Sequence, residues 1–411
     1  MQRKRREHPF VITEHPMTAL ERRSVSSLAL LYCFRMLGLF MVLPLLALYA
    51  IDMPGADPLM IGLALGIYGL SQALLQIPLG WLSDQLGRKP VIIGGLLVFA
   101  LGSIVAAMAD SIYGIVLGRA LQGAGAIAST VMALVADLTR EEQRTKAMAM
   151  VGMSIGLSFA VALVLGPAVA AAGGLGAVFW FTAALALGGI VIVLLLVPTP
   201  ERGLVHDDVG ARRGLFMRSL RDIGLLRLNF AVFSLHFILM ALFLVVPGLL
   251  LDVAGLHRDS HWLVYLPALV LSIAGMVPMM IIAERKGKLR EMFLLGIVLL
   301  MLAMVMLSIT VVPLVIYLGM WLFFVGFNYL EATLPSLVSK AVFEGGKGTA
   351  LGIYSTWQFF GAFAGGALGG WLVKAGGNGA LVICCLGLAA LWLLVFLPSH
   401  SVATRAAATS E

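Results

Sequence analysis

Long apolar stretches alternate with short polar segments along almost the whole chain. A helix needs about 20 mostly apolar residues to cross the hydrocarbon core of a bilayer, where every backbone polar group must be paired internally. Twelve stretches of that length occur, at Ser26–Ala50, Met60–Ser83, Pro90–Ala109, Ile112–Ala136, Ala147–Ala171, Ala177–Val197, Leu228–Leu251, Trp262–Ala283, Met292–Thr310, Pro313–Ser339, Thr349–Val373 and Ala380–Leu397. The pattern therefore predicts an all-α membrane protein with twelve transmembrane helices.

Basic residues are distributed unevenly between the two sides that these spans define. With the N-terminus in the cytoplasm, all but four of the 28 Lys and Arg residues fall in cytoplasmic segments. The outer loops contain only Arg258 and Lys374, while Arg35 and Arg119 lie within spans. Because cytoplasmic loops are enriched in Lys and Arg, we expect a multi-pass protein of a bacterial inner membrane with both termini in the cytoplasm.

One long polar connection divides the spans into six and six. We expect a cytoplasmic tail over 1–24, a six-helix half over 25–197, a cytoplasmic linker over 198–227, a second half over 228–398 and a tail over 399–411. A weak internal similarity supports the division, because Ala133–Asp137 and Ser336–Lys340 lie at equivalent places in the two halves. Two parallel six-helix halves are typical of transporters that bind their substrate between the halves, near the membrane midplane.

Composition and motif content exclude other classes. Charged residues make up 12% of the chain, whereas soluble domains contain roughly 25%. The sequence contains no metal-ligand cluster, nucleophile elbow or phosphate-binding glycine loop, and its three cysteines indicate no disulfide framework. We therefore expect no enzyme, cofactor, metal or nucleic-acid partner, and transport driven by an ion gradient.

Three motifs lie at the ends of spans or within them. The second span leads into a loop with Gly80, Asp84, Gly87 and Arg88, the fourth carries Arg119-Ala-Leu-Gln-Gly-Ala-Gly, and the fifth carries Gly166 and Pro167. They resemble the signature loop, the arginine motif and the antiporter motif of the major facilitator superfamily. Gln85 replaces a basic residue in the first motif, and Ala170-Ala171 replaces two glycines in the third.

The resemblance implies a conformational latch at the cytoplasmic face. In such a latch Arg88 pairs with Asp137, and Asp84 faces the start of the helix after Gly345–Gly348. A carboxylate is favourable at a helix N-terminus. The latch residues are Gly80, Asp84, Gly87, Arg88 and Asp137.

Shorter segments are similar to a drug:proton antiporter-like group within the superfamily. They are Phe34–Gly38, Leu138–Glu141, Arg144–Ala149 and Leu334–Leu337. The particular chains of this group that these segments resemble carry a small soluble domain after the twelfth helix. The sequence ends at Glu411, so we expect that domain to be missing here.

Four ionisable residues lie deep within spans: Arg35, Arg119, His236 and Glu331. Such groups are costly in a bilayer and mark functional sites. They occupy the first, fourth, seventh and tenth spans, which line the central cavity in the superfamily that the chain resembles. Helical spacing adds Tyr68, Gln72, Gln76, Asn328, Tyr354 and Gln358 as candidate cavity residues, with interhelical hydrogen bonding as the alternative. Asn229, Phe233, Met240 and Phe243 form a stripe with His236, and Met and Phe in such a stripe more often pack.

The arrangement predicts a secondary active transporter that exports a small amphiphilic organic compound by proton antiport. Glu331 is the expected proton carrier, because a buried carboxyl can alternate between a neutral form and an ionised form that a cation stabilises. Arg119 supplies a positive field, His236 is the second candidate carrier, and Arg35 either assists Glu331 or binds an anionic group. The alternatives are a proton-independent facilitator, a proton-coupled importer or a non-transporting membrane sensor. We expect a monomer in the lipid bilayer whose partners are protons and a small molecule.

Overall fold

The computed structural model describes residues 16–199, 209–309, 312–342 and 347–397 of the chain. These residues form helices and connecting turns, with no strand in the described part. The elements are α1 (Ala19–Tyr49), η1 (Ala50–Asp52), α2 (Pro58–Leu86), α3 (Arg88–Ala107), α4 (Ile112–Ala124), α5 (Ala128–Asp137), α6 (Glu141–Leu195), α7 (Val209–Arg221), α8 (Ile223–Asp252), η2 (Arg258–Ser260), α9 (Trp262–Arg285), α10 (Leu289–Ile309), α11 (Pro313–Ala341) and α12 (Lys347–Phe396).

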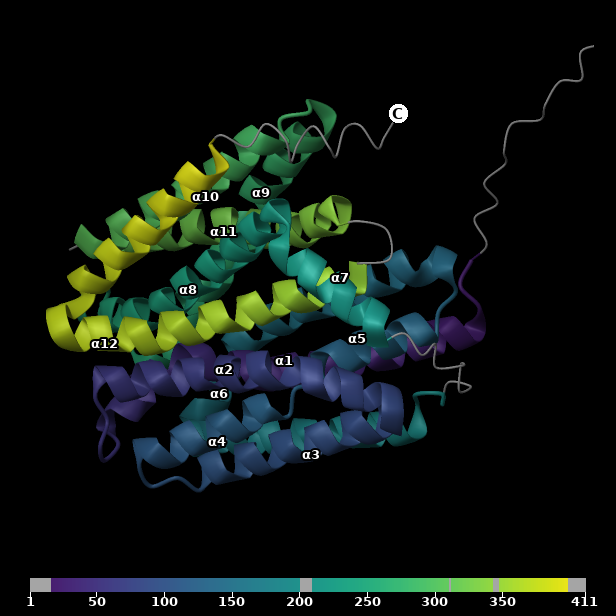
Figure 1. The fold of residues 1–411 in the computed structure, drawn as a ribbon. Coiled ribbons are helices and arrows are strands. Elements are labelled where there is room, and N and C mark those ends of the chain that lie inside the picture. The colour runs from purple at the N-terminus through teal and green to yellow at the C-terminus, as the bar shows by residue number, and fades with distance from the viewer. Residues whose placement is uncertain (1–15, 200–208, 310–311, 343–346, 398–411) are drawn as a thin grey trace, which may run out of the picture.

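Ten helical segments in the described residues are long and apolar enough to cross a membrane, with α4 and α5 together forming one of them. Two of the ten, α6 and α12, are interrupted by glycine pairs with non-helical backbone. Gly174 and Gly377 have φ of 69° and 70°, a region that favours glycine. Figure 1 shows α12 turning back on itself, so that its second arm lies beside α10. Each interrupted helix supplies two crossings, which gives twelve in the described part.

Several boundaries differ from those expected. The first helix begins at Ala19, before the expected Ser26, because Thr18 and Glu21 form a capping box at its N-terminus. The expected linker contains the helix α7, and α8 begins inside it at Ile223. The fourth span is broken between Ala124 and Ala128 rather than continuous.

The two halves meet closely along α2 and the first arm of α12 (Figure 1). This contact depends on glycine, because a Cβ on Gly62 would lie 2.2 Å from the carbonyl oxygen of Gly366. A Cβ on Gly370 would lie 2.3 Å from the carbonyl oxygen of Pro58. Small residues of this kind let helix backbones approach within a membrane, so α2 and α12 form a tight seam between the halves.

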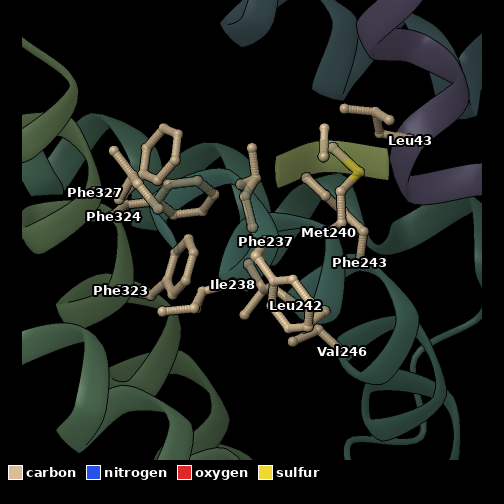
Figure 2. Packing of buried hydrophobic residues seen from close by; sticks show 14 of the residues in the cluster. Leu43, Phe237, Ile238, Met240, Leu242, Phe243, Val246, Phe323, Phe324 and Phe327 are labelled. Atoms are coloured by element: carbon tan, nitrogen blue, oxygen red, sulfur yellow. The ribbon is translucent and has the colours of Figure 1, made fainter. Parts of the chain in front are cut away.

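Aromatic side chains from α8 and α11 fill the core of the C-terminal half (Figure 2). Phe323 and Phe327 stack at 5.8 Å between ring centroids, and Phe323 meets Phe324 edge to face. Met240 and Phe243 of the expected stripe are buried in the same cluster. Their position is that of packing residues, and the Phe243 ring lies 6.1 Å from the Tyr265 ring of α9.

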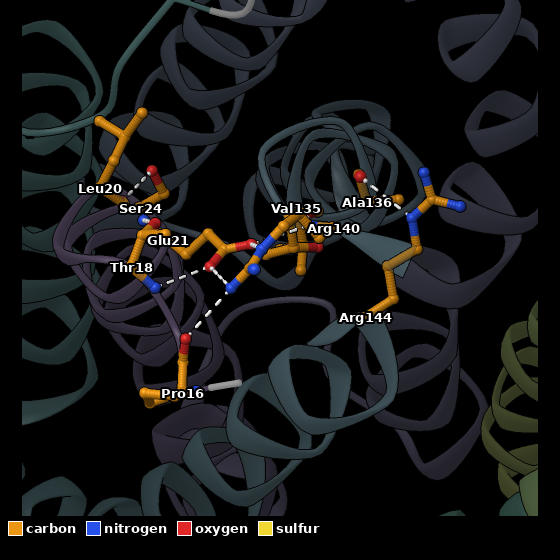
Figure 3. A network of polar contacts seen from close by, with 10 residues as sticks. Pro16, Thr18, Leu20, Glu21, Ser24, Val135, Ala136, Arg140 and Arg144 are labelled. Atoms are coloured by element: carbon orange, nitrogen blue, oxygen red, sulfur yellow. Dashed lines mark hydrogen bonds and ion pairs between the residues drawn. The ribbon is translucent and has the colours of Figure 1, made fainter. Parts of the chain in front are cut away.

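A polar network ties the start of α1 to the connection between α5 and α6 (Figure 3). The Arg140 side chain donates through Nε to Oε1 of Glu21 at 2.9 Å and through Nη2 to Oε2 at 3.0 Å. The backbone N–H of Arg140 also donates to Glu21 Oε1 at 2.9 Å. These bonds fix the end of the N-terminal half that carries the signature loop.

Candidate transport site and latch

Glu331, the acidic residue expected deep within a span of the C-terminal half, lies in a three-residue cluster. Gln358 on α12 donates from Nε2 to Oε1 of Glu331 on α11 at 3.2 Å. The same amide nitrogen lies 2.8 Å from Nε2 of His236 on α8. Three helices therefore converge on this point.

The hydrogen bonds of His236 determine its neutral tautomer. Its Nδ1 lies 3.1 Å from the carbonyl oxygen of Val232, which can only accept, so Nδ1 carries the proton. Nε2 is then free to accept from Gln358, and it lies 3.8 Å from Oε2 of Glu331. That carboxylate oxygen is buried and has no hydrogen-bond partner, although the Glu331 side chain is 35% exposed. An acceptor nitrogen and an acceptor oxygen therefore lie side by side at this point.

Tyr354 and Asn328, which were expected near Glu331, differ in their hydrogen bonds. Tyr354 is buried one turn before Gln358, and its hydroxyl has no hydrogen-bond partner. Asn328 donates instead to the hydroxyl of Ser272 on α9 at 2.8 Å. Asn328 therefore joins α11 to α9, and its amide nitrogen is engaged away from Glu331.

The remaining stripe residues of α8 pack against α12. Asn229 is buried, and a Cβ on Gly361 would lie 2.3 Å from the carbonyl oxygen of Phe233. The Phe233 ring meets Trp357 edge to face at 6.0 Å. This close contact holds His236 at the distance that Gln358 needs.

The N-terminal half buries two arginines, each 1% exposed. Arg35 donates from Nη2 to Gln72 Oε1 at 2.8 Å and to the carbonyl oxygen of Gly125 at 3.1 Å. Its guanidinium lies 5.7 Å from the centre of the Phe99 ring. The break between α4 and α5 frees the Gly125 carbonyl for this bond, since the carbonyls at a helix end have no intrahelical partner.

Arg119 is held by a second set of neutral groups. It donates from Nη1 to Gln122 Oε1 at 2.9 Å and from Nε to the carbonyl oxygen of Ala64 at 3.3 Å. Its guanidinium lies 5.0 Å from the centre of the Tyr68 ring. Gln122 in turn donates to Ser103 at 2.8 Å, so the arginine motif anchors α4 to α2 and α3.

Gln76 on α2 connects the two halves, because its side chain forms hydrogen bonds to α12. Its Nε2 donates to Thr356 Oγ1 at 2.8 Å and lies 3.3 Å from the carbonyl oxygen of Gly352 on α12. Thr356 could not be selected from the sequence pattern, because a single Thr in an apolar helix carries no signal until its partner is known.

The signature loop forms the expected pair between Arg88 and Asp137. Arg88 Nε lies 3.0 Å from Asp137 Oδ2, and Nη1 lies 2.5 Å from Asp84 Oδ1 and 2.7 Å from Ser83 Oγ. Gly87, with φ of 95°, makes the turn between α2 and α3. The expected position of Asp84 at the start of α12 involves Gly345 and Gly346, which lie outside the described residues.

Glycine also sets two close approaches in these motifs. A Cβ on Gly80 would lie 3.1 Å from Ser129 Oγ, which donates to the carbonyl oxygen of Gln76 at 2.8 Å. In the antiporter motif, Gly166 lies one residue before Pro167 in α6. A Cβ on Gly166 would lie 3.1 Å from the carbonyl oxygen of Met41 on α1. The motifs therefore bring α5 against α2 and α6 against α1.

Further polar contacts, which the sequence pattern did not predict, join the halves at the helix ends opposite the signature loop. Lys374 donates to Asp57 at 2.8 Å, Arg258 donates to Asp52 at 3.0 Å, and Tyr49 donates to Asp259 at 3.2 Å. A signal for two of them was present, because Arg258 and Lys374 are the two basic residues of the loops that were expected to lie outside the cytoplasm. No group of three His, Cys, Asp or Glu side chains within the described ranges could hold a metal ion.

Two half-bundles around buried charges define this protein as a multi-pass membrane transporter. Residues 28–366 match the family described as the Major Facilitator Superfamily, and the chain belongs to that family. Its members are transporters rather than enzymes, and they work without a cofactor.

Individual relatives agree with this membership. The chain is 46% identical to the inner membrane transport protein YajR of Escherichia coli over 387 residues, which is 93% of this chain and 85% of that protein. It is 26% identical to the multidrug resistance protein MdtH of Klebsiella pneumoniae, over 83% of this chain and 84% of that one. The structure of the nucleoside transporter NupG has a TM-score of 0.73 at 13% identity, covering 91% of this chain and 98% of that one. At that identity the likeness is one of fold.

Proposed function

We propose that the protein is a proton antiporter that exports a small amphiphilic organic compound by alternating access. The observation that carries the proposal is the cluster of Glu331, His236 and Gln358. It combines a carboxylate oxygen without a hydrogen-bond partner and an imidazole nitrogen 3.8 Å away. Ionisable groups at bilayer depth mark proton and substrate pathways.

The proton and a basic group of the substrate compete for Glu331 in this mechanism. Protonated Glu331 is neutral and holds no cation, whereas ionised Glu331 offers two acceptor oxygens. Neutral His236 accepts from Gln358 and provides a neighbouring site for the same proton. Exclusive binding of one cation or the other at a single carboxylate is sufficient for antiport.

Movement of the two halves against each other supplies the access. The outer ties Asp57–Lys374, Asp52–Arg258 and Tyr49–Asp259 join the halves on one side. On the other side, the latch of Arg88, Asp84 and Asp137 braces the loop that faces α12. We place this latch and both termini in the cytoplasm, so the outer ties open when the latch side closes.

The names of two relatives support a role in export from an inner membrane. YajR is named as an inner membrane transport protein, and MdtH as a multidrug resistance protein. The boundaries proposed for the tails, the halves and the linker follow the same arrangement. A monomer contains both halves and therefore a complete cavity.

Glu331→Gln tests the proposal, because glutamine mimics the neutral acid and cannot release a proton. The measurement is made in proteoliposomes with an imposed pH gradient, using cationic, anionic and zwitterionic amphiphilic dyes. The variant should lose gradient-driven transport by at least about tenfold, since the proton relay contributes on the order of 1.4 kcal/mol or more. Exchange of substrate for substrate should continue, because it needs no net change in protonation.

The matched control is Glu291→Gln, which changes an exposed glutamate in the first turn of α10. It should transport at the wild-type rate. Substrate-driven proton movement at the wild-type rate in Glu331→Gln would remove Glu331 from the mechanism, and His236 would be examined next.

A further inference from the structure

The polar centre of the N-terminal half has too few hydrogen-bond acceptors. Its buried side-chain atoms without a hydrogen-bond partner are Nε and Nη1 of Arg35, Nη2 of Arg119, Nε2 of Gln72 and the hydroxyl oxygen of Tyr68. The four nitrogens can only donate, and the hydroxyl can donate as well. Turning the Gln72 amide round does not help, because its oxygen already accepts from Arg35. Buried donors without acceptors are costly, so this centre is suited to a ligand rich in acceptors.

These atoms belong to one connected group. Arg35 is bonded to Gln72, and the Arg119 guanidinium lies over the ring of Tyr68. Tyr68 and Gln72 are four residues apart on α2 and therefore share a face. The unpaired donors of two arginines thus border the same stretch of one helix.

The described residues also provide no counter-charge for this centre. No carboxylate of the described residues lies within 4.0 Å of Arg35 or Arg119, whose partners are two amides, two backbone carbonyls and two aromatic rings. Both guanidiniums remain charged at physiological pH, and buried charges are normally paired. A carboxylate supplies both the charge and the acceptors, because its two oxygens bind a guanidinium with two parallel hydrogen bonds.

The C-terminal half presents the opposite requirement. Glu331 has an unpaired acceptor, and its hydrogen-bond donor is the neutral amide of Gln358. We propose that the substrate is a zwitterion: its anionic group binds the Arg35, Gln72, Tyr68 and Arg119 centre, and its basic group binds Glu331. The second contact rests on the proposed function, whereas the first depends only on the N-terminal half.

Gln72→Glu tests the anion site without a known substrate. The new carboxylate would take the place of the amide 2.8 Å from Arg35 and would give the centre a charge and an additional acceptor. The melting temperature of the purified protein should therefore rise by a few degrees. The matched control is Gln76→Glu, one turn further along α2. It would lose the donor to Thr356 and Gly352 and place a charge beside a carbonyl oxygen, so its melting temperature should fall.

Ligand binding gives a second measurement, made on the wild-type protein. Hydrocinnamate, phenethylamine, phenethyl alcohol and phenylalanine share one aromatic body and differ in charge. Hydrocinnamate and phenylalanine should raise the melting temperature more than the alcohol does. Gln72→Glu should abolish the response to hydrocinnamate, since the introduced carboxylate already occupies the site.

The outcomes separate this inference from the proposed function. Glu331→Gln should keep the rise in melting temperature caused by hydrocinnamate. It should lose any further rise that phenylalanine causes beyond that of hydrocinnamate through its amino group. An anion response with wild-type proton movement in Glu331→Gln would retain the anion site and reject the antiport mechanism. A lower melting temperature in Gln72→Glu, or hydrocinnamate acting no more strongly than phenethyl alcohol, would overturn the anion site.

Discussion

The two halves repeat one fold but place opposite chemistry at its centre. Their glycine turns, at Gly173-Gly174 and Gly376-Gly377, lie 203 residues apart and have similar dihedral angles. The N-terminal centre holds two cations with neutral partners, whereas the C-terminal centre holds a carboxylate, an imidazole and an amide. Repetition of the fold therefore provides two similar frames, and a few polar residues give them different tasks.

The difference has an electrostatic consequence. A zwitterion or a proton placed between the halves meets an excess of donors on one side and an unpaired acceptor on the other. In a low-dielectric interior such interactions are much stronger than in water. The polarity of the two centres is thus decided by side chains that the repeated backbone does not specify.

The largest expected effect concerns the seam between α2 and α12. The two halves can differ in their tasks only if they pack and move as separate units. Gly62→Leu would place its Cβ 2.2 Å from the backbone oxygen of Gly366, which cannot rotate away. We expect a loss of about 3 kcal/mol in stability, measured as a fall in melting temperature and in folded yield. Gly94→Leu is the control, since a Cβ there meets nothing within 4 Å. Equal stability of the two variants would contradict a tight seam.

A smaller effect is expected at the latch, where Arg88 pairs with two carboxylates of the N-terminal half. Arg88→Ala removes charged hydrogen bonds to Asp137 and Asp84, worth about 2 kcal/mol together at this partly exposed position. The inward-open population should rise, as reported by alkylation of a cysteine on the cytoplasmic side of the cavity. Exchanging Arg88 and Asp137 should restore part of the wild-type labelling. Unchanged labelling in Arg88→Ala would remove the latch from the mechanism.

The smallest effect is expected at the outer ties. The hydrogen bond from Lys374 is the main reason that the pKa of Asp57 lies below its usual value, and the bond from the Met60 backbone adds to it. Because a carboxyl with a lowered pKa stays ionised to lower pH, the tie should persist when the outer medium is mildly acidic. Lys374→Met should raise outside accessibility by only about twofold, since exposed ion pairs contribute about 0.5 kcal/mol. A strong dependence of wild-type accessibility on outer pH between neutral and mildly acidic would contradict the persistence of this tie.

The positions of the membrane spans could be predicted because the length of an apolar stretch is a local property of the sequence. The expected breaks between the fifth and sixth spans and between the last two contain Gly173-Gly174 and Gly376-Gly377. The helix α7 was missed because it is polar and lies in the linker, where hydrophobic length gives no signal. The pair of Arg88 and Asp137 was expected only because the loop resembles the signature loop of the superfamily, since the two residues are 49 positions apart and their spacing alone does not predict a contact.

Contacts between distant helices that no resemblance indicated could not be predicted. Helical spacing placed Asn328 on the face of Glu331, yet its amide nitrogen donates to Ser272, 56 residues earlier in the chain. The same limit applied to Gln76, whose partner Thr356 is 280 residues away. Hydrogen bonds are short and directional, so the rotation of each helix and the approach of its neighbour decide which polar groups meet.

The sequence by itself determined the class of the protein, the number of spans and the residues that carry charge into the membrane, since each depends on composition over a short stretch. Only the tertiary structure decided that Glu331 shares an amide with His236 and that Arg35 and Arg119 have no acidic partner among the described residues. Those facts depend on where six helices bring their side chains together. The physical reason is that burial is a cost that local sequence reveals, whereas the partner that offsets it comes from another part of the chain.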